Sequence, residues 1–222
     1  MSKSRDEVLS TPELVELTLS HLPIRDLLVT APLVCQTWRA ITLTPVLQRA
    51  LFFEPDPSFR SERLRNPLLM EIFAPFFTPE ARSHWDWPDA GAIKSMPWSK
   101  APDAFNRPEA SWRRMLVSQP LPQKLLVTEI YYRRGGARER RAVLDNQPLR
   151  MEPLYDITLP LVDRVASSFC VHWQQDVTLA VAYTQQRRWG SMRVLDMRFY
   201  STLTTHKTNL EFGKWSLRSP TP

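Results

Sequence analysis

The chain has 222 residues, of which 43% are hydrophobic and 23% are charged, with a formal net charge of +6. This composition is typical of a globular protein, and the length suits one ordinary domain plus a small module. The sequence contains no apolar run long enough to span a membrane and no secretory leader at the N-terminus, and its two cysteines lie far apart. We therefore expect an intracellular protein of the cytoplasm, the nucleus or both, without a disulfide framework or a membrane partner.

The positive charge is concentrated in the later part of the chain. Residues 1–50 carry five Lys or Arg side chains and five Asp or Glu side chains, so the whole excess lies after residue 50. A basic excess of this size permits acidic partners without identifying one.

Residues 8–41 predict three very short helices. The first begins at Pro12, because proline suits a first helical turn, and ends before Pro23, because the residue before a proline is disfavoured in the helical conformation. The second contains Asp26–Leu28, and the third covers Leu33–Ile41. Isolated helices of this length are marginal in water, so the segment needs either the rest of the chain or a partner.

The residues of this segment resemble the F-box. TPELVEL, HLP, RDLL and VCQTWR follow one another in the order and spacing of that family. Thr11 stands where many F-boxes carry leucine, and TPEL is a form that F-boxes of the filamentous-fungal type often show. The segment EASWRRML within residues 107–120 also resembles a segment that recurs in those fungal F-box proteins.

The resemblance implies a substrate-recognition subunit of a Skp–cullin–F-box ubiquitin ligase, which is not itself an enzyme. In that family the F-box docks on a Skp-family adaptor, which recruits a cullin–RING ligase, and another domain holds the protein target. Matching positions give the expected adaptor contacts, which are Pro12, Leu14, Leu17, Leu22, Pro23, Leu27, Leu28, Val34, Cys35 and Trp38. We expect Leu14, Leu22 and Leu28 to face the adaptor and Trp38 to anchor the helices.

A second function from another class stays open at this point. The basic region after residue 50 also fits an F-box protein that acts outside any ligase, as a scaffold or a nucleic-acid-associated factor. A steep salt dependence of nucleic-acid binding would favour it. A third reading, an enzyme with a fortuitous F-box match, has no supporting residues.

The F-box-like module is expected to span residues 1–53 and to close with a fourth helix that begins near Pro45. Residues 54–108 contain nine prolines but also many aromatic residues, so they predict a connecting arm packed on the next domain. Asn66-Pro67 predicts a short helix within this arm. The alternative is an exposed, tryptophan-rich patch that binds a partner.

Residues 109–215 predict an α+β domain that would bind the target, and residues 216–222 a frayed tail. The domain is expected to contain a largely antiparallel sheet of four to five strands. The chain shows no internal repeat, which argues against leucine-rich, kelch and WD40 target domains.

A helix is predicted over residues 106–119. Trp112 and Leu116 would form its buried face, whereas Arg113 and Arg114 are expected to face solvent.

Several later segments predict strands. Residues 125–132 are β-branched and aromatic. Alternating apolar residues at 169–173 and 177–183 predict a hairpin, and residues 195–199 a final strand. A short helix is expected to start near Pro160.

The sharpest charge run is RRGGARERR, residues 133–141, in which five arginines accompany Glu139. Gly135-Gly136 suits a turn, which leaves a hairpin with a second strand at 142–144 open, but a solvated, mobile loop is the favoured interpretation. The functional alternative is an anion or target site, because arginine pairs bind carboxylate and phosphate. Its residues would be Arg133, Arg134, Arg138, Arg140 and Arg141. The run lacks interleaved aromatic residues, which argues against nucleic acid as its partner.

The sequence offers no catalytic or metal site and no cofactor motif. Five glycines leave no phosphate-binding loop, and the four histidines match no zinc spacing. Cys170 and His172 would share one side of a strand, but no third group orients them for proton transfer. We interpret them as a packed pair, and the segment His84–Pro88 as packing too.

Overall fold

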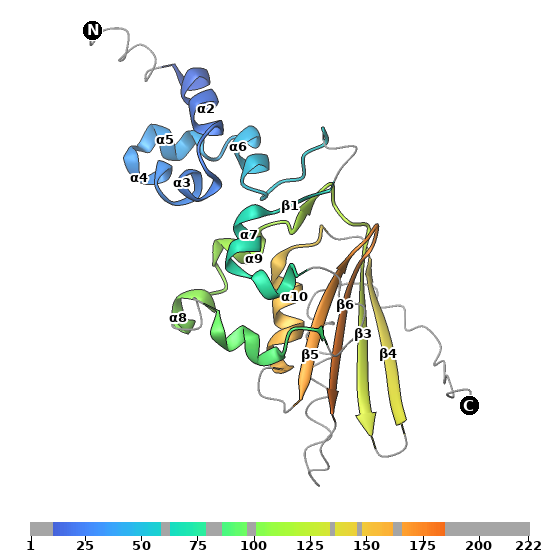
Figure 1. Ribbon diagram of the computed structural model, residues 1–222. Coiled ribbons are helices and arrows are strands. Elements are labelled where there is room, and N and C mark those ends of the chain that lie inside the picture. The colour runs from blue at the N-terminus through green and yellow to red at the C-terminus, as the bar shows by residue number, and fades with distance from the viewer. Residues whose placement is uncertain are drawn as a thin grey trace.

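The computed structural model describes residues 11–58, 63–78, 86–96, 101–133, 136–145, 148–161 and 166–184. Within these residues the chain forms a group of short helices in the N-terminal part and a sheet with further helices in the rest, in a mixed α and β architecture (Figure 1). The strand expected at 195–199 and the tail at 216–222 lie outside the described residues.

From residue 11 on, the described N-terminal part forms five short helices, which we call the N-terminal helical module. They are α2 (Pro12–Ser20), α3 (Ile24–Val29), α4 (Ala31–Val34), α5 (Gln36–Ile41) and α6 (Pro45–Ala50). Proline occupies one of the first two positions of α2, α4 and α6, where its missing N–H costs nothing. The prediction of one helix over residues 33–41 is wrong, because Cys35 has an extended backbone that separates α4 from α5. The Cys35 Sγ instead accepts the Trp38 N–H at the start of α5.

The arm is built from short elements that carry core residues. They are β1 (Leu64–Arg65), α7 (Pro67–Ile72), the 3-10 helices η1 (Ala74–Phe76) and η3 (Ala90–Ser95), and α8 (Pro102–Phe105). The predicted helix start at Asn66 is confirmed: its Oδ1 accepts the N–H groups of Leu68 and Leu69. Its Nδ2 donates to the Leu116 carbonyl, so this fully buried amide is bonded at both ends.

The helix predicted over residues 106–119 is wrong in its length. Only α9 (Ser111–Arg114) is helical, and β2 (Ser118–Gln119) pairs antiparallel with β1. Between them Met115, Leu116 and Val117 are all 0% exposed. An amphipathic surface helix would turn one of three consecutive residues outward, so an apolar run buried on every side favours extended backbone.

Among the described residues the main sheet has four strands, within the expected four to five, in the order β4-β3-β6-β5. They are β3 (Lys124–Arg133), β4 (Gly136–Asp145), β5 (Ser167–Trp173) and β6 (Val177–Thr184). The pairs β3–β4 and β5–β6 are antiparallel, whereas the central pair β3–β6 is parallel. A parallel pair needs a long crossover, and this one includes β4, α10 (Met151–Thr158), the 3-10 helix η5 (Leu159–Leu161) and β5.

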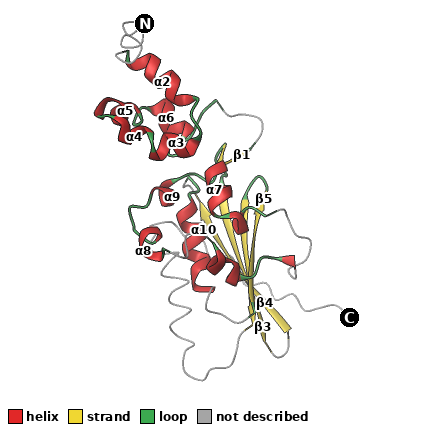
Figure 2. Ribbon diagram, turned by 60° about the vertical axis from the view of Figure 1, so that its left-hand side comes forward, coloured by secondary structure: helices red, strands yellow, loops and turns green. Residues whose placement is uncertain are grey.

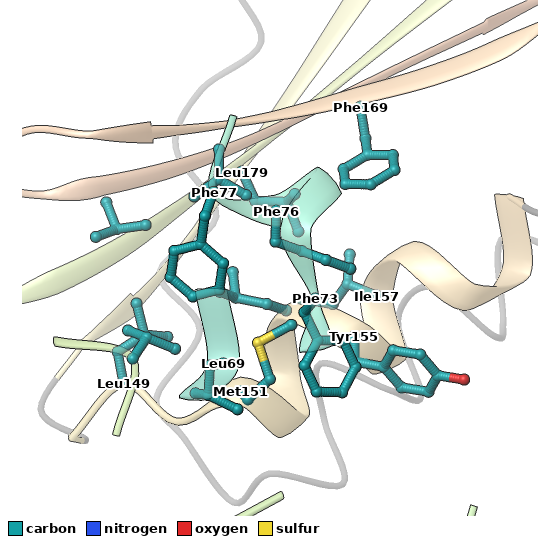
Figure 3. Packing of buried hydrophobic residues seen from close by; sticks show 14 of the residues in the cluster. Leu69, Phe73, Phe76, Phe77, Leu149, Met151, Tyr155, Ile157, Phe169 and Leu179 are labelled. Atoms are coloured by element: carbon teal, nitrogen blue, oxygen red, sulfur yellow. The ribbon is translucent and has the colours of Figure 1, made fainter. Parts of the chain in front are cut away.

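The helices α7 and α10 lie against one face of the sheet (Figure 2). Between them and the strands lies the main hydrophobic core, in which Phe73, Phe76, Tyr155 and Phe169 are almost completely buried (Figure 3). Their rings meet at tilted or edge-to-face angles, with centroids 4.8 to 6.1 Å apart. Residues of the arm therefore supply a large part of the core beneath the sheet.

Candidate functional site

The N-terminal helical module has a small core of its own. It consists of Val15, Leu19, Leu27, Ala31, Ile41, Leu47 and Leu51. Each of these side chains is at most 6% exposed. The core holds the helices together, but seven apolar residues provide little burial for a segment of this length.

The surface of the same module is unusually apolar. Leu14 and Leu17 on α2 are 42% and 59% exposed, and Leu33 and Val34 on α4 are 82% and 55% exposed. Val29, Leu43 and Val46 are also more than half exposed. Single exposed apolar side chains are common, but such a concentration on one small module is typical of a protein-binding surface.

The residues that the F-box resemblance assigns to the adaptor fall into two groups. Six of them are exposed, namely Pro12, Leu14, Leu17, Pro23, Val34 and Cys35. Leu22 and Trp38 are partly buried and pack against the module core, which agrees with the expected anchoring role of Trp38.

Leu22, Leu27 and Leu28 are less exposed than the six residues above. Leu27 is 1% exposed and belongs to the module core, so it cannot contact a partner directly. Leu22 packs against that core, and Leu28 packs against both the module core and the main core. In a helix as short as α3 one face packs inward, and that face includes Leu27 and Leu28.

Sequence reasoning missed Leu33 and Leu43 as candidate contacts. Leu33 lies in the one-turn helix α4 and Leu43 in the turn between α5 and α6, where helical periodicity does not assign a face, and both are at least 70% exposed. The only sequence signal was their apolar character next to proline or a turn residue.

The module is joined to the rest of the protein through bonds at the end of α6. The Phe52 carbonyl accepts the Leu116 N–H at 2.7 Å. The side chain of Gln119, which is 2% exposed, donates from Nε2 to the carbonyls of Arg49 and Glu54, each at 3.1 Å. Phe52 has a φ of 60°, a left-handed conformation that is strained for a bulky side chain and needs such support.

Side chains also cross this junction. Ile24, Leu28 and Phe53 pack against both hydrophobic clusters. The Arg114 guanidinium lies 5.2 Å from the Phe53 ring centroid. We call this set of contacts, together with the Gln119 bonds, the module junction. In the structure it holds the helical module against the α+β part of the chain.

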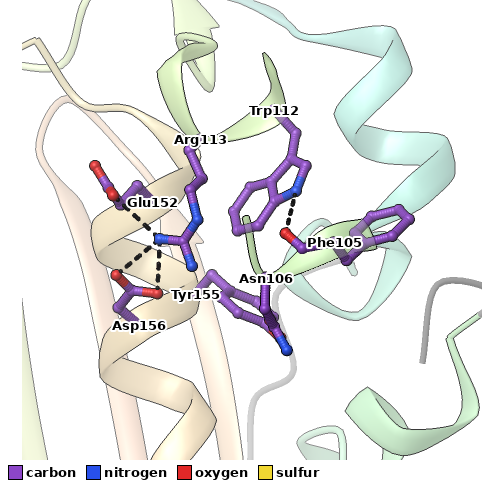
Figure 4. A network of polar contacts seen from close by, with 7 residues as sticks. All are labelled: Phe105, Asn106, Trp112, Arg113, Glu152, Tyr155 and Asp156. Atoms are coloured by element: carbon purple, nitrogen blue, oxygen red, sulfur yellow. Dashed lines mark hydrogen bonds and ion pairs between the residues drawn. The ribbon is translucent and has the colours of Figure 1, made fainter. Parts of the chain in front are cut away.

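The segment SWRRM forms a polar network between α9 and α10 (Figure 4). The expectation that Arg113 faces solvent is wrong: its side chain is 11% exposed and its Nη1 lies 3.1 Å from oxygens of both Glu152 and Asp156. The guanidinium also lies 4.8 Å from the Trp112 ring centroid. Trp112 Nε1 in turn donates to the Phe105 carbonyl at 3.1 Å.

Ionisation in this network follows from its burial. Burial by itself would lower the pKa of Arg113, but the hydrogen bonds and charges of Asp156 and Glu152 outweigh it and raise that pKa. Burial raises the pKa of the Tyr155 hydroxyl to about 12. Arg113 therefore stays a cation and Tyr155 a neutral hydroxyl, which fits a structural clamp between α9 and α10.

The described residues of the arginine run lie on two paired strands rather than in a loop. Arg133 ends β3, and Arg138, Arg140 and Arg141 lie in β4, so the favoured loop interpretation is wrong for residues 136–141. The strand begins before residue 142 because β3 extends far enough to pair with it. Gly136 has a φ of 125°, a conformation that suits glycine. Arg134 lies outside the described residues.

The structure does not gather the arginines of β4 into one cluster. Arg140 lies 5.3 Å from the Tyr131 ring centroid, with Nη1 4.0 Å from a carboxylate oxygen of the buried Glu129. Arg141 points to the other face of the sheet and pairs with Glu139 at 2.5 Å. Arg138 is exposed.

Within the part of the chain that the structure describes, no group of His, Cys, Asp and Glu side chains is placed to hold a metal ion. Cys170 is fully buried in β5, and His172 is partly buried with its ring 6.1 Å from that of Trp87. Among the same residues no helix is both long and apolar enough to cross a membrane.

Comparison of the chain with models of protein families, with curated proteins and with solved structures finds no match.

Proposed function

We propose that the protein is a non-catalytic substrate receptor of a Skp–cullin–F-box ubiquitin ligase. In this proposal the N-terminal helical module docks on a Skp-family adaptor, and the α+β part of the chain holds a protein target. The receptor accelerates ubiquitin transfer by tethering, because a target held beside the charged enzyme reacts at a high effective concentration.

One observation carries the proposal. The F-box-like string folds as a separate helical module, and six of its ten matched positions are exposed, including Leu14 at 42% and Leu17 at 59%. Apolar side chains that face water on a module with so small a core are best explained by a partner that covers them.

The module junction supports the same proposal. A receptor has to place its target at a defined distance from the ligase, and a flexible tether would dilute that advantage. The bonds of Gln119 and Leu116 to the end of α6, with Phe53 packed against both cores, couple the two parts of the chain firmly.

The test is binding of the full chain to a purified Skp-family adaptor, comparing the wild type with the double variant Leu14→Glu/Leu17→Glu. Full burial of one leucine contributes about 1.5–3 kcal/mol. Leu14 and Leu17 are already partly buried in the unbound protein, so each should contribute the lower value. We therefore expect the double variant to lose about 3 kcal/mol of binding free energy, or roughly a hundredfold in Kd. Titration calorimetry measures this directly.

The matched control is Leu64→Glu/Leu159→Glu, which changes two leucines of similar exposure, 46% and 38%, outside the module. This control should bind the adaptor like the wild type. Wild-type affinity of the Leu14→Glu/Leu17→Glu variant would remove α2 from the interface. An equal loss in both variants would point to a general effect of the new charges.

A further inference from the structure

The two edges of the main sheet differ. At the β5 edge, Asp89 forms a bridge with Ser168, and the Phe169 N–H donates to the Pro88 carbonyl at 3.1 Å. At the opposite edge, β4 is ten residues long, and β3 is its single partner among the described strands. A long edge strand presents a row of backbone N–H and C=O groups that can pair with another chain.

The side chains of β4 are solvated and mostly cationic where the strand begins. Ala137, Arg138, Glu139 and Arg141 are exposed, and the Arg141 side chain is 73% exposed. Arg140 is held closer to the protein, with its side chain 22% exposed against Tyr131. The accessible charges on this edge are therefore Arg138 on one face of the strand and Arg141, with its partner Glu139, on the other.

The charges on β4 favour one kind of added strand over another. A second copy of the chain paired edge to edge would bring arginine strands together, and like charges on neighbouring strands are destabilising. An added strand with acidic residues opposite Arg138 and Arg141 would gain cross-strand ion pairs instead. Because residues three apart on a strand point to opposite faces, the matching acidic residues would themselves be three apart.

We propose that β4 takes up an extended, acidic segment of a protein partner as a strand added beside the four described ones. The identification of that partner as the ubiquitination target rests on the proposed function. The edge strand and its charges are observed independently of that function. The end of β3 and the start of β4 lie far from the N-terminal helices, at the opposite end of the described chain (Figure 1 and Figure 2), so the module surface and this edge leave room for two partners at once.

The test uses a fluorescein-labelled peptide, Thr-Val-Glu-Val-Thr-Glu-Val-Thr, with the full chain and fluorescence anisotropy. The variant Arg138→Glu/Arg141→Glu should weaken binding by about tenfold, since it reverses two exposed pairs. The control Arg39→Glu/Arg107→Glu changes two exposed arginines away from the sheet and should bind like the wild type. A peptide with lysine in place of both glutamates should not bind.

Strand addition has a signature that simple charge attraction lacks. Two peptides, one N-methylated at its odd-numbered residues and one at its even-numbered residues, should differ. One of them should not bind and the other should bind as before, because only every second N–H of an added strand faces β4. Equal tolerance of both N-methylated peptides, equal binding to the two protein variants, or no binding to the wild type would overturn the proposal.

The adaptor titration distinguishes failure here from failure of the proposed function. If the adaptor binds and the peptide does not, the edge proposal falls alone. If the peptide binds with the expected signature and the adaptor does not, the edge still accepts an acidic strand, and the ligase assignment falls.

Discussion

Replacement of Arg113 by methionine tests the polar network between α9 and α10. Methionine keeps much of the apolar stem that packs on Trp112 but removes the charge. The arginine makes bonds to Glu152 and Asp156, whose side chains are 34% and 26% exposed. Hydrogen bonds between charged groups contribute about 1.5–3 kcal/mol each. Because both carboxylates are partly solvated, each of the two Arg113 bonds should contribute a value near the lower end of that range. The expected loss is therefore about 3 kcal/mol in the free energy of unfolding.

The assay is chemical and thermal unfolding of Arg113→Met beside Arg114→Met. In a chain of this size 1 kcal/mol shifts Tm by about 2–4 °C, so we expect Tm of Arg113→Met to fall by about 6–12 °C. Arg114 is exposed and has an aromatic contact with Phe53, so its replacement should cost less than about 1 kcal/mol. A loss below 1 kcal/mol for Arg113→Met, or equal losses in the two variants, would refute the assignment of Arg113 as a buried clamp.

Three further changes have expected outcomes. Leu27→Ala should destabilise the module by about 2–5 kcal/mol, since Leu27 is 1% exposed, and a stability within 1 kcal/mol of the wild type by thermal unfolding would contradict its place in the module core. Gln119→Ala should cost about 1–3 kcal/mol, because the carbonyls of Arg49 and Glu54 each lose a hydrogen bond, and hydrogen exchange should speed up at the Leu116 amide; unchanged exchange there would argue against the module junction. Because the pKa of Tyr155 is about 12 in the folded protein against an ordinary 10.0, the unfolded state loses this proton first, so stability should fall as the pH rises from 10 to 12. Tyr155→Phe should reduce this dependence of the unfolding free energy on pH, as measured by urea unfolding at several pH values. The substitution itself should cost little, since the hydrogen bond from the hydroxyl to Asn106 is 3.4 Å long. An unchanged pH dependence would contradict the assignment.

The features that the sequence predicted well depend on local chemistry. Proline at Pro12 and Pro45, and the Asn66 cap, set helix starts through backbone geometry that needs no tertiary contact. The hairpin of β5 and β6 followed from alternation of apolar residues, which reports a half-buried strand directly.

The features that it missed depend on contacts between distant segments. Arg113 looks like a surface residue until α10, some forty positions later, brings Glu152 and Asp156 beside it. The helix α10 itself was not predicted; its Pro153 is the third helical residue, and proline in the first turn is tolerated.

The exposure of the candidate adaptor residues was likewise only partly predictable. The apolar face of α2 is wide, and the sequence does not say which part the module core covers. The structure buries Val15 and Leu19 and leaves Leu14 and Leu17 exposed. Likewise, the packing of Leu28 against both cores depends on the module junction, which no local pattern reports.

The most direct test of the ligase proposal is reconstitution of the full chain with a Skp-family adaptor and a cullin, followed by size-exclusion chromatography with light scattering. The proposal predicts a single peak that contains one copy of each protein. Elution of the chain alone as a folded 25.9-kDa monomer, with the adaptor and cullin in a separate peak, would contradict it.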